Sequence, residues 1–206
     1  MLKITKIITG LLMFLTFTSC SDDDAIIDNN QDLKSYELVD IQWRLTETDG
    51  QRIIEEQIPE FSFENNSDTV MEIVIEPLKD LKGFSIFKFE DSEAFSVINY
   101  EEIKVSIPEE ISFLSEGYSN LIGGIKVPLT NEKSSFPFST TVKNSTNLQP
   151  NSKLTSNYTV FLRENKASFL ATFKEMNTGE ILKLNGGWTG LFFNNLEVET
   201  VTNPID

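Results

Sequence analysis

Lys153-Leu-Thr-Ser-Asn-Tyr-Thr-Val-Phe-Leu162 sets the pattern of this chain, because an apolar side chain recurs at nearly every second position. That period is typical of a β-strand with one buried face and one wet face. Three more stretches of this kind follow, namely Ala167–Phe173, Ile181–Leu184 and Trp188–Phe193. Turn-forming residues separate the stretches at Asn144–Asn147, Arg163–Lys166, Asn177–Gly179 and Asn185–Gly187. Strands repeating at about ten-residue intervals predict antiparallel sheets.

The same period extends upstream from this region. Strands are predicted at Tyr36–Trp43, Glu60–Glu64, Val70–Ile75, Phe84–Phe89, Glu102–Ile107 and Ser139–Val142. A less regular stretch, punctuated by Gly117, Gly123 and Gly124, ends at Ile125–Val127. Asn65–Asp68 is predicted as a turn, and Ser92–Glu102 fits a helix or a strand equally well. The predicted fold class is therefore all-β with antiparallel sheets, built either as one elongated sheet or as a β-sandwich.

Phenylalanine dominates the aromatic content, with 16 Phe against four Tyr and two Trp. Many of these residues alternate with polar ones, as in Phe61/Phe63, Phe87/Phe89 and Phe136/Phe138. A surface that binds glycans favours Trp and Tyr, whose polar tips suit contact with water. The Phe pairs are therefore expected to face the cores of the sheets.

Composition excludes several kinds of chemistry. The 206 residues carry a net charge of −15, which disfavours a nucleic-acid partner because phosphates are bound by clustered Lys and Arg. The chain has no His and one Cys, so a Ser-His-Asp triad, an imidazole metal site and an internal disulfide are all excluded. The acidic runs Asp22–Asp24 and Asn65–Asp68 lack the ligand spacing of a calcium loop. No metal and no cofactor is expected.

Adjacent carboxylates are the remaining candidates for catalysis. The pairs are Glu55-Glu56, Glu101-Glu102 and Glu109-Glu110. Neighbouring residues on a strand point to opposite faces of the sheet, and no spacing here distinguishes an acid from a base. A carboxylate-dependent hydrolase is therefore the least favoured function, and the chain is expected not to be an enzyme.

The first 19 residues have the features of a lipoprotein signal peptide. Lys3 and Lys6 form a basic start, and the apolar run Ile7–Phe17 is too short to span a bilayer. Phe17-Thr-Ser-Cys20 resembles a bacterial lipobox, although Leu is commoner than Phe at its first position. The resemblance implies that Cys20 is lipidated, carries acyl chains such as palmitate, and becomes the first mature residue.

The residues after Cys20 are acidic. Ser21-Asp22-Asp23-Asp24 resembles the export tag of Bacteroidetes surface lipoproteins, which implies a lipid-anchored place on the outer face of the outer membrane. Residues 20–35 are expected to form an acidic flexible tether, and residues 36–206 a single β domain. Removing residues 1–19 leaves 15 basic against 32 acidic residues, a net charge of −17.

Residues 60–200 resemble a family of β proteins in the order of their motifs. Asn147–Val160 resembles the proline-marked strand entry of the epsilon-toxin branch of aerolysin-like proteins. Ala167–Phe173, Thr178–Glu180 and Gly186-Gly-Trp-Thr-Gly190 resemble its closing strands, and Phe63–Thr69 its Asn-rich first strand. The resemblance implies an elongated aerolysin-like module that forms pores and assembles into homo-oligomers.

The chain also departs from that family. Gln149-Pro150 stands where two prolines are frequent, and Phe84–Val127 lacks a clear insertion hairpin with alternating Ser and Thr. The first functional hypothesis is therefore that the chain is a surface lipoprotein with a non-catalytic binding role and a glycan or protein ligand. The alternative is an aerolysin-like pore-forming protein. One long sheet would favour the alternative, and two packed sheets would favour an adhesion module.

Overall fold

The structure is a computed structural model, and it describes residues 35–96, 98, 103–113 and 119–205. The chain divides into two units, residues 1–31 and 32–206, and all the described residues belong to the second. Its first strands are β1 (Tyr36–Arg44), β2 (Gly50–Asn65), β3 (Met71–Ile75) and β4 (Lys82–Phe89), followed by the short helix α1 (Ser92–Ser96). The remaining strands are β5 (Lys104–Ser106), β6 (Glu110–Phe113), β7 (Ser119–Ile122), β8 (Lys126–Pro128), β9 (Ser134–Pro137), β10 (Asn144–Leu148), β11 (Ser152–Glu175) and β12 (Ile181–Pro204). The fold is all-β with antiparallel sheets, as the period-two pattern predicts.

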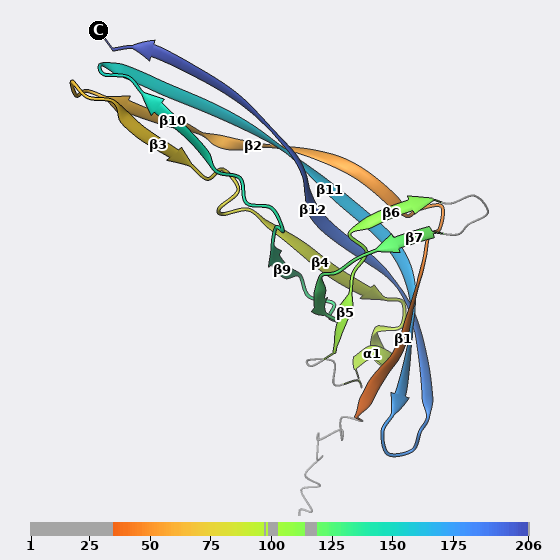
Figure 1. The fold of residues 1–206 in the computed structure, drawn as a ribbon. Coiled ribbons are helices and arrows are strands. Elements are labelled where there is room, and N and C mark those ends of the chain that lie inside the picture. Colours follow the sequence, from red (N-terminus) through yellow and green to blue (C-terminus); the bar gives the residue numbers. More distant parts are fainter. Residues whose placement is uncertain (1–34, 97, 99–102, 114–118, 206) are drawn as a thin grey trace, which may run out of the picture. The chain divides into compact units, whose positions relative to one another are not determined.

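One six-stranded antiparallel sheet holds most of the chain (Figure 1). Its strand order is β1-β11-β12-β4-β9, and β2 also pairs with β11. β1 pairs with the far part of β11, from Ser168 to Glu175, and β2 pairs with the near part, from Ser152 to Lys166. The two strands therefore follow one another along the same edge of β11.

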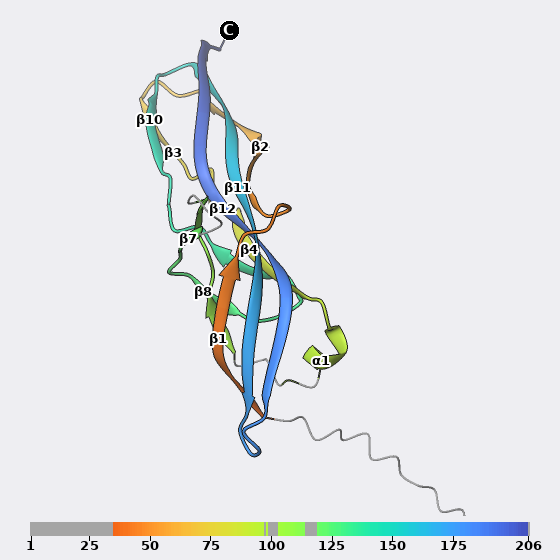
Figure 2. The same cartoon turned by 90° about the vertical axis from the view of Figure 1, so that its right-hand side faces the viewer.

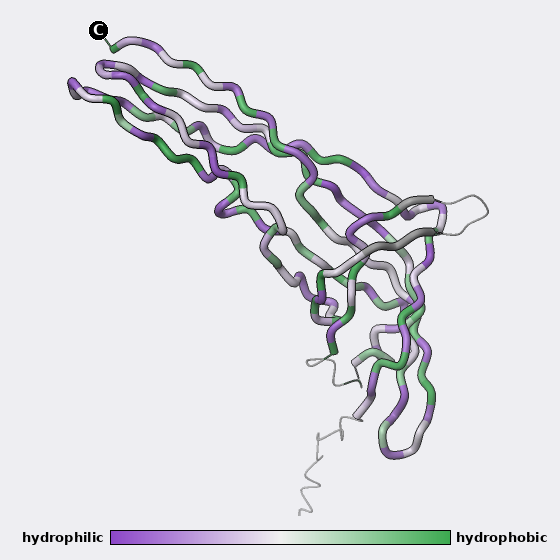
Figure 3. The backbone as a smooth tube through the Cα atoms, viewed as in Figure 1, coloured by the Kyte–Doolittle hydropathy of each residue, from purple (hydrophilic) through white to green (hydrophobic). Residues whose placement is uncertain are grey.

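β11 and β12 are the backbone of the sheet, at 24 residues each. They pair from Ser152 opposite Pro204 to Lys174 opposite Ile181, which corresponds to about 75 Å at the usual rise per residue. Figure 3 shows the hydrophobic and hydrophilic residues alternating along both strands. One long sheet, rather than two large packed sheets, therefore organises the described residues.

Three two-stranded sheets accompany the long sheet, and they pair β10 with β3, β5 with β8, and β6 with β7. β3 and β10 lie alongside the β2–β11–β12 end in both views (Figures 1 and 2). There Ile73, Ile75 and Leu148 pack against Leu154 and Tyr158 of β11. A larger core lies further along β11, around Phe169, Trp188 and Phe87.

Two predicted turns are wrong, because β11 and β12 continue straight through them. At Arg163–Lys166 the polar side chains are paired within the fold, since Glu164 accepts hydrogen bonds from Arg52 at 2.5 and 3.0 Å. At Asn185–Gly187 it is Gly186 that serves close packing. A Cβ on Gly186 would lie 2.4 Å from the carbonyl oxygen of Lys88.

The prediction around residue 140 is also wrong. Ser139–Val142 is not a strand, and the predicted turn at Asn144–Asn147 is part of β10. Its polar side chains find partners there, since Ser145 Oγ donates to Glu72 at 2.9 Å and Asn144 Nδ2 donates to the Tyr158 hydroxyl at 3.1 Å. Of the stretch Ser92–Glu102, residues 92–96 form a helix, which the Asp91 carboxylate caps at the amide of Ala94, while residues 97 and 99–102 lie outside the described residues.

The predicted place of the Phe pairs is confirmed in part. Phe87 and Phe136 are buried, and Phe89 packs partly buried against the same core. Phe61 and Phe63 are partly buried beside Tyr158. Among the described residues no helix is long and apolar enough to cross a bilayer.

β2 lies at the edge of the sheet, because among the described strands it pairs with β11 alone. Its pairing slips between Ser156 and Tyr158, so that Pro59 and Glu60 form a bulge opposite Asn157. Proline cannot donate to a strand ladder, and bulges are frequent at sheet edges. The bulge therefore makes this edge unsuitable for pairing with a further strand.

The turn between β11 and β12 depends on a buried carboxylate. Hydrogen bonds from Thr178 and from the amide of Asn177 hold the pKa of Glu175 below its ordinary value. We expect Glu175→Gln to lower the free energy of unfolding at pH 7. The wild-type advantage is present above the unfolded pKa of about 4.3 and is lost as the pH falls through the lower folded pKa.

Urea unfolding of both proteins at neutral pH and near pH 3 measures this difference. A gap between the two proteins that is equally large at both pH values would contradict the assigned role of Glu175.

Candidate functional site

Residues 104–128 contain the two arms of one β-hairpin, Lys104–Phe113 and Ser119–Pro128, although the strands of each arm are interrupted. β5 pairs with β8 from Lys104 opposite Pro128, and β6 pairs with β7 as far as Phe113 opposite Ser119. Between these pairs, the amide of Ile107 donates to the carbonyl of Ile125 at 3.0 Å. Each step along one arm is matched by one step along the other, so the register never slips between the two short sheets.

The two arms of this hairpin are amphipathic. Pairing places Val105 opposite Val127 and Ile107 opposite Ile125 on one face, since opposed residues point the same way, and Glu109 and Ile111 follow on that face of the first arm. The alternate positions hold Lys104, Ser106, Pro108 and Glu110 on one arm, and Gly124, Lys126 and Pro128 on the other. Val105, Ile107 and Val127 are buried in the core beneath the long sheet. The apolar face is therefore covered in this conformation.

Two polar side chains of β11 hold the middle of the first arm. Asn165 is fully buried, and its Nδ2 donates to the carbonyls of Pro108 at 3.2 Å and Glu109 at 2.8 Å. Arg163 Nη2 donates to the same Glu109 carbonyl at 2.9 Å. Arg163 Nε and Asn165 Oδ1 are buried without a hydrogen-bond partner. An unpaired buried polar group costs about 1–3 kcal/mol, so this contact, which we call the clamp, is incompletely satisfied.

The second arm is tied to the first at the same level. The carboxylate of Glu109 accepts hydrogen bonds from the amides of Gly124 at 2.8 Å and Ile125 at 3.1 Å. Gly123 allows the close approach, since a Cβ there would lie 1.7 Å from the carbonyl oxygen of Ile107. The clamp, Glu109 and Gly123 together hold the hairpin at one level along β11.

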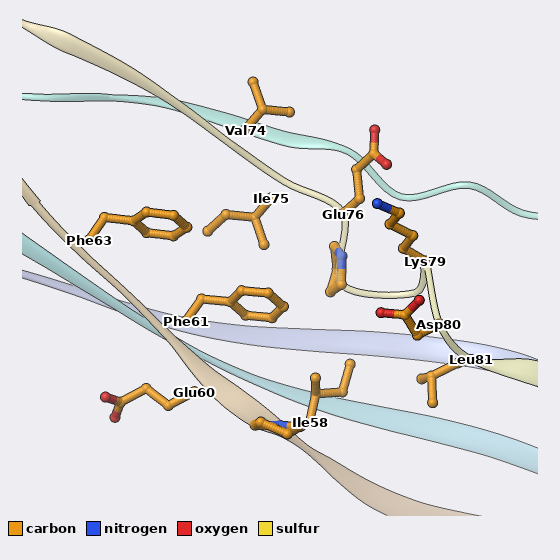
Figure 4. A pocket seen from close by; sticks show the side chains of 12 residues that line it. Ile58, Glu60, Phe61, Phe63, Val74, Ile75, Glu76, Lys79, Asp80 and Leu81 are labelled. Carbon is orange, nitrogen blue, oxygen red and sulfur yellow. The ribbon is translucent and has the colours of Figure 1, made fainter.

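A second feature is a pocket of about 620 Å³ between β2 and β3 (Figure 4). Ile58, Phe61 and Phe63 line one side, and Val74, Ile75 and Leu81 line the other. Glu60, Glu76, Lys79 and Asp80 add charged groups. Glu76 forms an ion pair with Lys143 at 2.8 Å, and this hydrogen bond lowers the pKa of Glu76. An apolar interior with polar groups around it is the usual form of a binding pocket.

The polar centre of β11 has a structural role of its own. Glu164 is buried, and its hydrogen bond to Arg52 holds the pKa of this carboxyl below its ordinary value. Lys166 lies 3.6 Å from the same carboxylate. These charges are paired within the sheet, so they support the strand beside the clamp.

The residues proposed for lipidation and export lie outside the described residues. Cys20, Ser21, Asp22, Asp23 and Asp24 therefore stay predictions, as do the signal peptide and the tether. Of the carboxylate pairs, Glu109 serves the hairpin, Glu110 is exposed on β6, and Glu55 and Glu56 are adjacent on β2, while Glu101 and Glu102 lie outside the described residues. The described part of the chain brings together no group of three or more acidic, His or Cys side chains suited to a metal.

The sequence pattern alone does not identify the hairpin. Alternating Ser and Thr are its expected mark, whereas the alternate positions here also hold Lys, Glu, Pro and Gly. The available signal is the period of Val105, Ile107 and Ile111 in the first arm. The interruption at Pro108, which lacks an amide hydrogen, hid the continuity.

Comparison with known proteins gives no family. No family model matches the chain, and no curated protein matches it. Among solved structures, a lamprey immune protein is similar over 82% of this chain at 15% identity, with a TM-score of 0.49. The chain spans 54% of that protein's length.

Two further structures are similar at lower scores. The parasporin-2 toxin of Bacillus thuringiensis, whose description says that it recognizes cancer cells, matches 82% of this chain and 75% of its own at 11% identity, with a TM-score of 0.41. An aerolysin-like protein of Bombina maxima matches 83% of this chain and 99% of its own at 10% identity, with a TM-score of 0.36. What these proteins recognise is a property of those proteins.

The clamp can be tested by substitution. We expect Asn165→Ala to raise the hydrogen-exchange rates of the Gly124 and Ile125 amides about tenfold, because the arm loses contacts worth about 1–3 kcal/mol. Exchange measured by mass spectrometry over residues 103–129 checks this.

Asn157→Ala is the matched control, since Asn157 is an exposed residue of the same strand. Equal exchange in both variants, or a uniform rise across β11 and β12, would count against a local clamp.

Proposed function

We propose that this protein is a lipid-anchored surface lipoprotein that acts without catalysis, by assembling into homo-oligomers and inserting residues 104–128 into a target membrane. The observation that carries the proposal is the hairpin's unbroken register, with arms Lys104–Phe113 and Ser119–Pro128. The resemblance of residues 60–200 to aerolysin-like proteins supports it, as does the single long sheet. A non-catalytic binding role remains the second candidate.

The length and pattern of the arms suit a bilayer. A tilted strand crosses the hydrocarbon layer with about 9–11 residues, and each arm supplies ten. Membrane strands place apolar side chains toward lipid at every second position and polar ones toward the lumen. Val105, Ile107 and Ile111 on one face, with Lys104 and Ser106 on the other, follow this rule, whereas Glu109 interrupts the apolar face between Ile107 and Ile111.

Insertion would require several copies of the chain. A single hairpin in lipid leaves two strand edges with unpaired backbone groups, and each unpaired group costs several kcal/mol there. A closed barrel removes these edges, and one chain contributes two strands to it. Homo-oligomerisation is therefore part of the proposed mechanism.

Release of the hairpin has a definite cost in the soluble state. Val105, Ile107 and Val127 leave the core, and the clamp and Glu109 lose their hydrogen bonds. In lipid, the apolar side chains are again removed from water, which recovers about 25 cal/mol per Å². Membrane contact and assembly together would supply the driving force.

The anchor is the second part of the proposal. Acylation of Cys20 behind residues 1–19 would hold the chain at the outer membrane, and Ser21–Asp24 would send it to the cell surface. Each buried methylene contributes about 0.8 kcal/mol, so several acyl chains on one residue hold a protein firmly. The net charge of −17 opposes adsorption of the body to anionic lipid and a nucleic-acid partner alike.

The insertion step predicts a difference between the two faces of the hairpin. We expect Ile111→Lys to raise the dose for dye release from vesicles at least tenfold, because a lysine facing lipid costs up to about 2–4 kcal/mol. Ser106→Lys adds the same charge on the opposite face at an exposed position, and should leave release near wild type.

Both variants are first checked by thermal unfolding, so that a folding defect is recognised. Equal release by both variants, or vesicles that stay intact with the wild-type protein at any dose, would sink the pore-forming role.

The anchor makes a separate prediction. We expect Cys20→Ser to move the protein from the membrane fraction to the soluble fraction of the cell, and to abolish the mass increase of acylation. Mass spectrometry of the N-terminal peptide measures this. Unchanged membrane association in the variant would refute lipidation without bearing on the hairpin.

The pocket between β2 and β3 favours the second candidate, a binding role toward a glycan or protein ligand. Phe61 and Phe63 offer aromatic surface, and Glu60 and Asp80 form no ion pair within the described residues. We expect Phe63→Ala to weaken binding of any ligand found on a glycan array or by pull-down. Binding that is insensitive to Phe63 would place the ligand elsewhere.

A further inference from the structure

The chain enters the described domain beside the turn that joins β11 and β12. The amide of Met176 donates to the carbonyl of Ser35 at 2.8 Å, and Tyr36 pairs with Glu175. Figures 1 and 2 both show the start of β1 next to this turn. The same end of the sheet therefore carries both the turn and the entry of the chain.

Three large apolar side chains are exposed at this end. Val39 is 55% exposed, Met176 55% and Ile181 52%. Val39 is the extra residue of the bulge between Leu38 and Asp40, which pair with Phe173 and Thr172. Large apolar side chains exposed at the same end of a sheet are a feature of interaction surfaces. We call Val39, Met176 and Ile181 the entry-side tip.

The tip is held rigidly. The carboxylate of Glu175 accepts hydrogen bonds from the amides of Asn177 and Thr178, and the amide of Glu180 donates to Thr178 Oγ1 at 3.2 Å. Gly179 takes the left-handed conformation that the turn requires, with φ of 74°. Met176 and Ile181 are therefore presented at fixed positions, and little conformational entropy is lost when they make a contact.

Charge at the tip is mixed. Lys174 faces Glu37 on one side and Ile181 on the other, and Thr172 lies between Asp40 and Lys183. Glu180 is also nearby in the turn. The mixture gives no preference for anionic lipid, so a zwitterionic membrane is the suitable surface.

The length of chain before Ser35 limits where the tip can be. Residues 21–34 separate Cys20 from Ser35, and fifteen residue steps reach about 50 Å when fully extended and about 20 Å on average as a coil. Leu154, in the core near the opposite end of β11, lies about 70 Å further along the strand from Glu175. An anchor on Cys20 therefore keeps the tip within a tether's length of its membrane, whereas the opposite end of β11 lies further away than the tether can reach unless the sheet lies flat.

We propose that the entry-side tip rests on the lipid surface of the membrane that holds Cys20. The inference depends on the anchor proposed above and on no step of pore formation. Val39, Met176 and Ile181 enter the headgroup layer of that membrane. Three side chains bind weakly alone, but a short tether gives an effective concentration in the millimolar range, at which a weak contact is occupied.

The test separates this contact from natural lipidation. Residues 20–206 are coupled through Cys20, the one cysteine in the sequence, to a maleimide phospholipid in phosphatidylcholine vesicles. Met176→Trp and Val201→Trp place a new indole at the tip and on β12 near the opposite end of the sheet. Val201, at 53%, is exposed to the same degree as Met176. Brominated phosphatidylcholine quenches an indole that touches the acyl chains.

We expect the fluorescence added by Met176→Trp to shift to shorter wavelength and to be lost in brominated vesicles, while that of Val201→Trp is unchanged. The parent protein gives the baseline of Trp43 and Trp188. Ile181→Trp is a second reporter at the tip if Met176→Trp does not fold.

Three results would overturn the proposal. The first is no quenching at either tip position. The second is equal quenching at the tip and at Val201, which would mean that the sheet lies flat on the bilayer. The third is a soluble dimer that Met176→Ser dissociates, which would assign the tip to a second copy of the chain.

Because the coupling is chemical, a chain that is not acylated in the cell would still give a clear answer here. Failure of the vesicle-release experiment would likewise leave this result unaffected.

Discussion

The pairing of β11 with β12 is the constraint on which the other elements depend. Because both strands run for 24 residues, their two outer edges are long enough to accept β1 and β2 in succession on one side and β4 on the other. β1 and β4 bury side chains in the core near Phe169 at one end, and β2 buries side chains in the core near Tyr158 at the other. A break in this pair would therefore separate two cores that share no other long element.

The middle of the β11–β12 pair carries a group of polar side chains. Arg163, Glu164 and Asn165 occupy three successive positions, and since neighbours on a strand face opposite ways, they serve different faces. Glu164 binds Arg52 from the neighbouring strand, while Arg163 and Asn165 reach the backbone of the hairpin. The same three residues thus keep the strand continuous and fix the position along β11 at which the hairpin is held. A long sheet with an incompletely satisfied clamp at its centre is stable as a whole and weaker at one place.

The sequence predicts the presence of the strands better than the residues at which they begin and end. The alternation of apolar and polar residues gives the fold class and the positions of β1, β3 and β4, because each of these strands has one buried face. It fails at Arg163–Lys166 and Asn185–Gly187, where charges and glycines indicate turns in isolation but find partners across the sheet, such as Arg52 and Phe169. Pairing between distant segments decides these positions, and one sequence does not contain that information. For the same reason, the hairpin of residues 104–128 is recognised from the pairing of its two arms in the structure and not from its amino-acid composition.

The bulge at Pro59 and Glu60 has a consequence for how copies of the chain meet. β2 presents its outer edge to solvent, and Glu55 and Glu56 join Glu60 along it. Two such edges repel one another, and a proline interrupts the ladder that a further strand would need. This repulsion is screened over about 8–10 Å at physiological salt, so it acts once two edges are nearly in contact. Freely diffusing chains are thereby kept from aggregating edge to edge, and encounters between copies are directed to other surfaces.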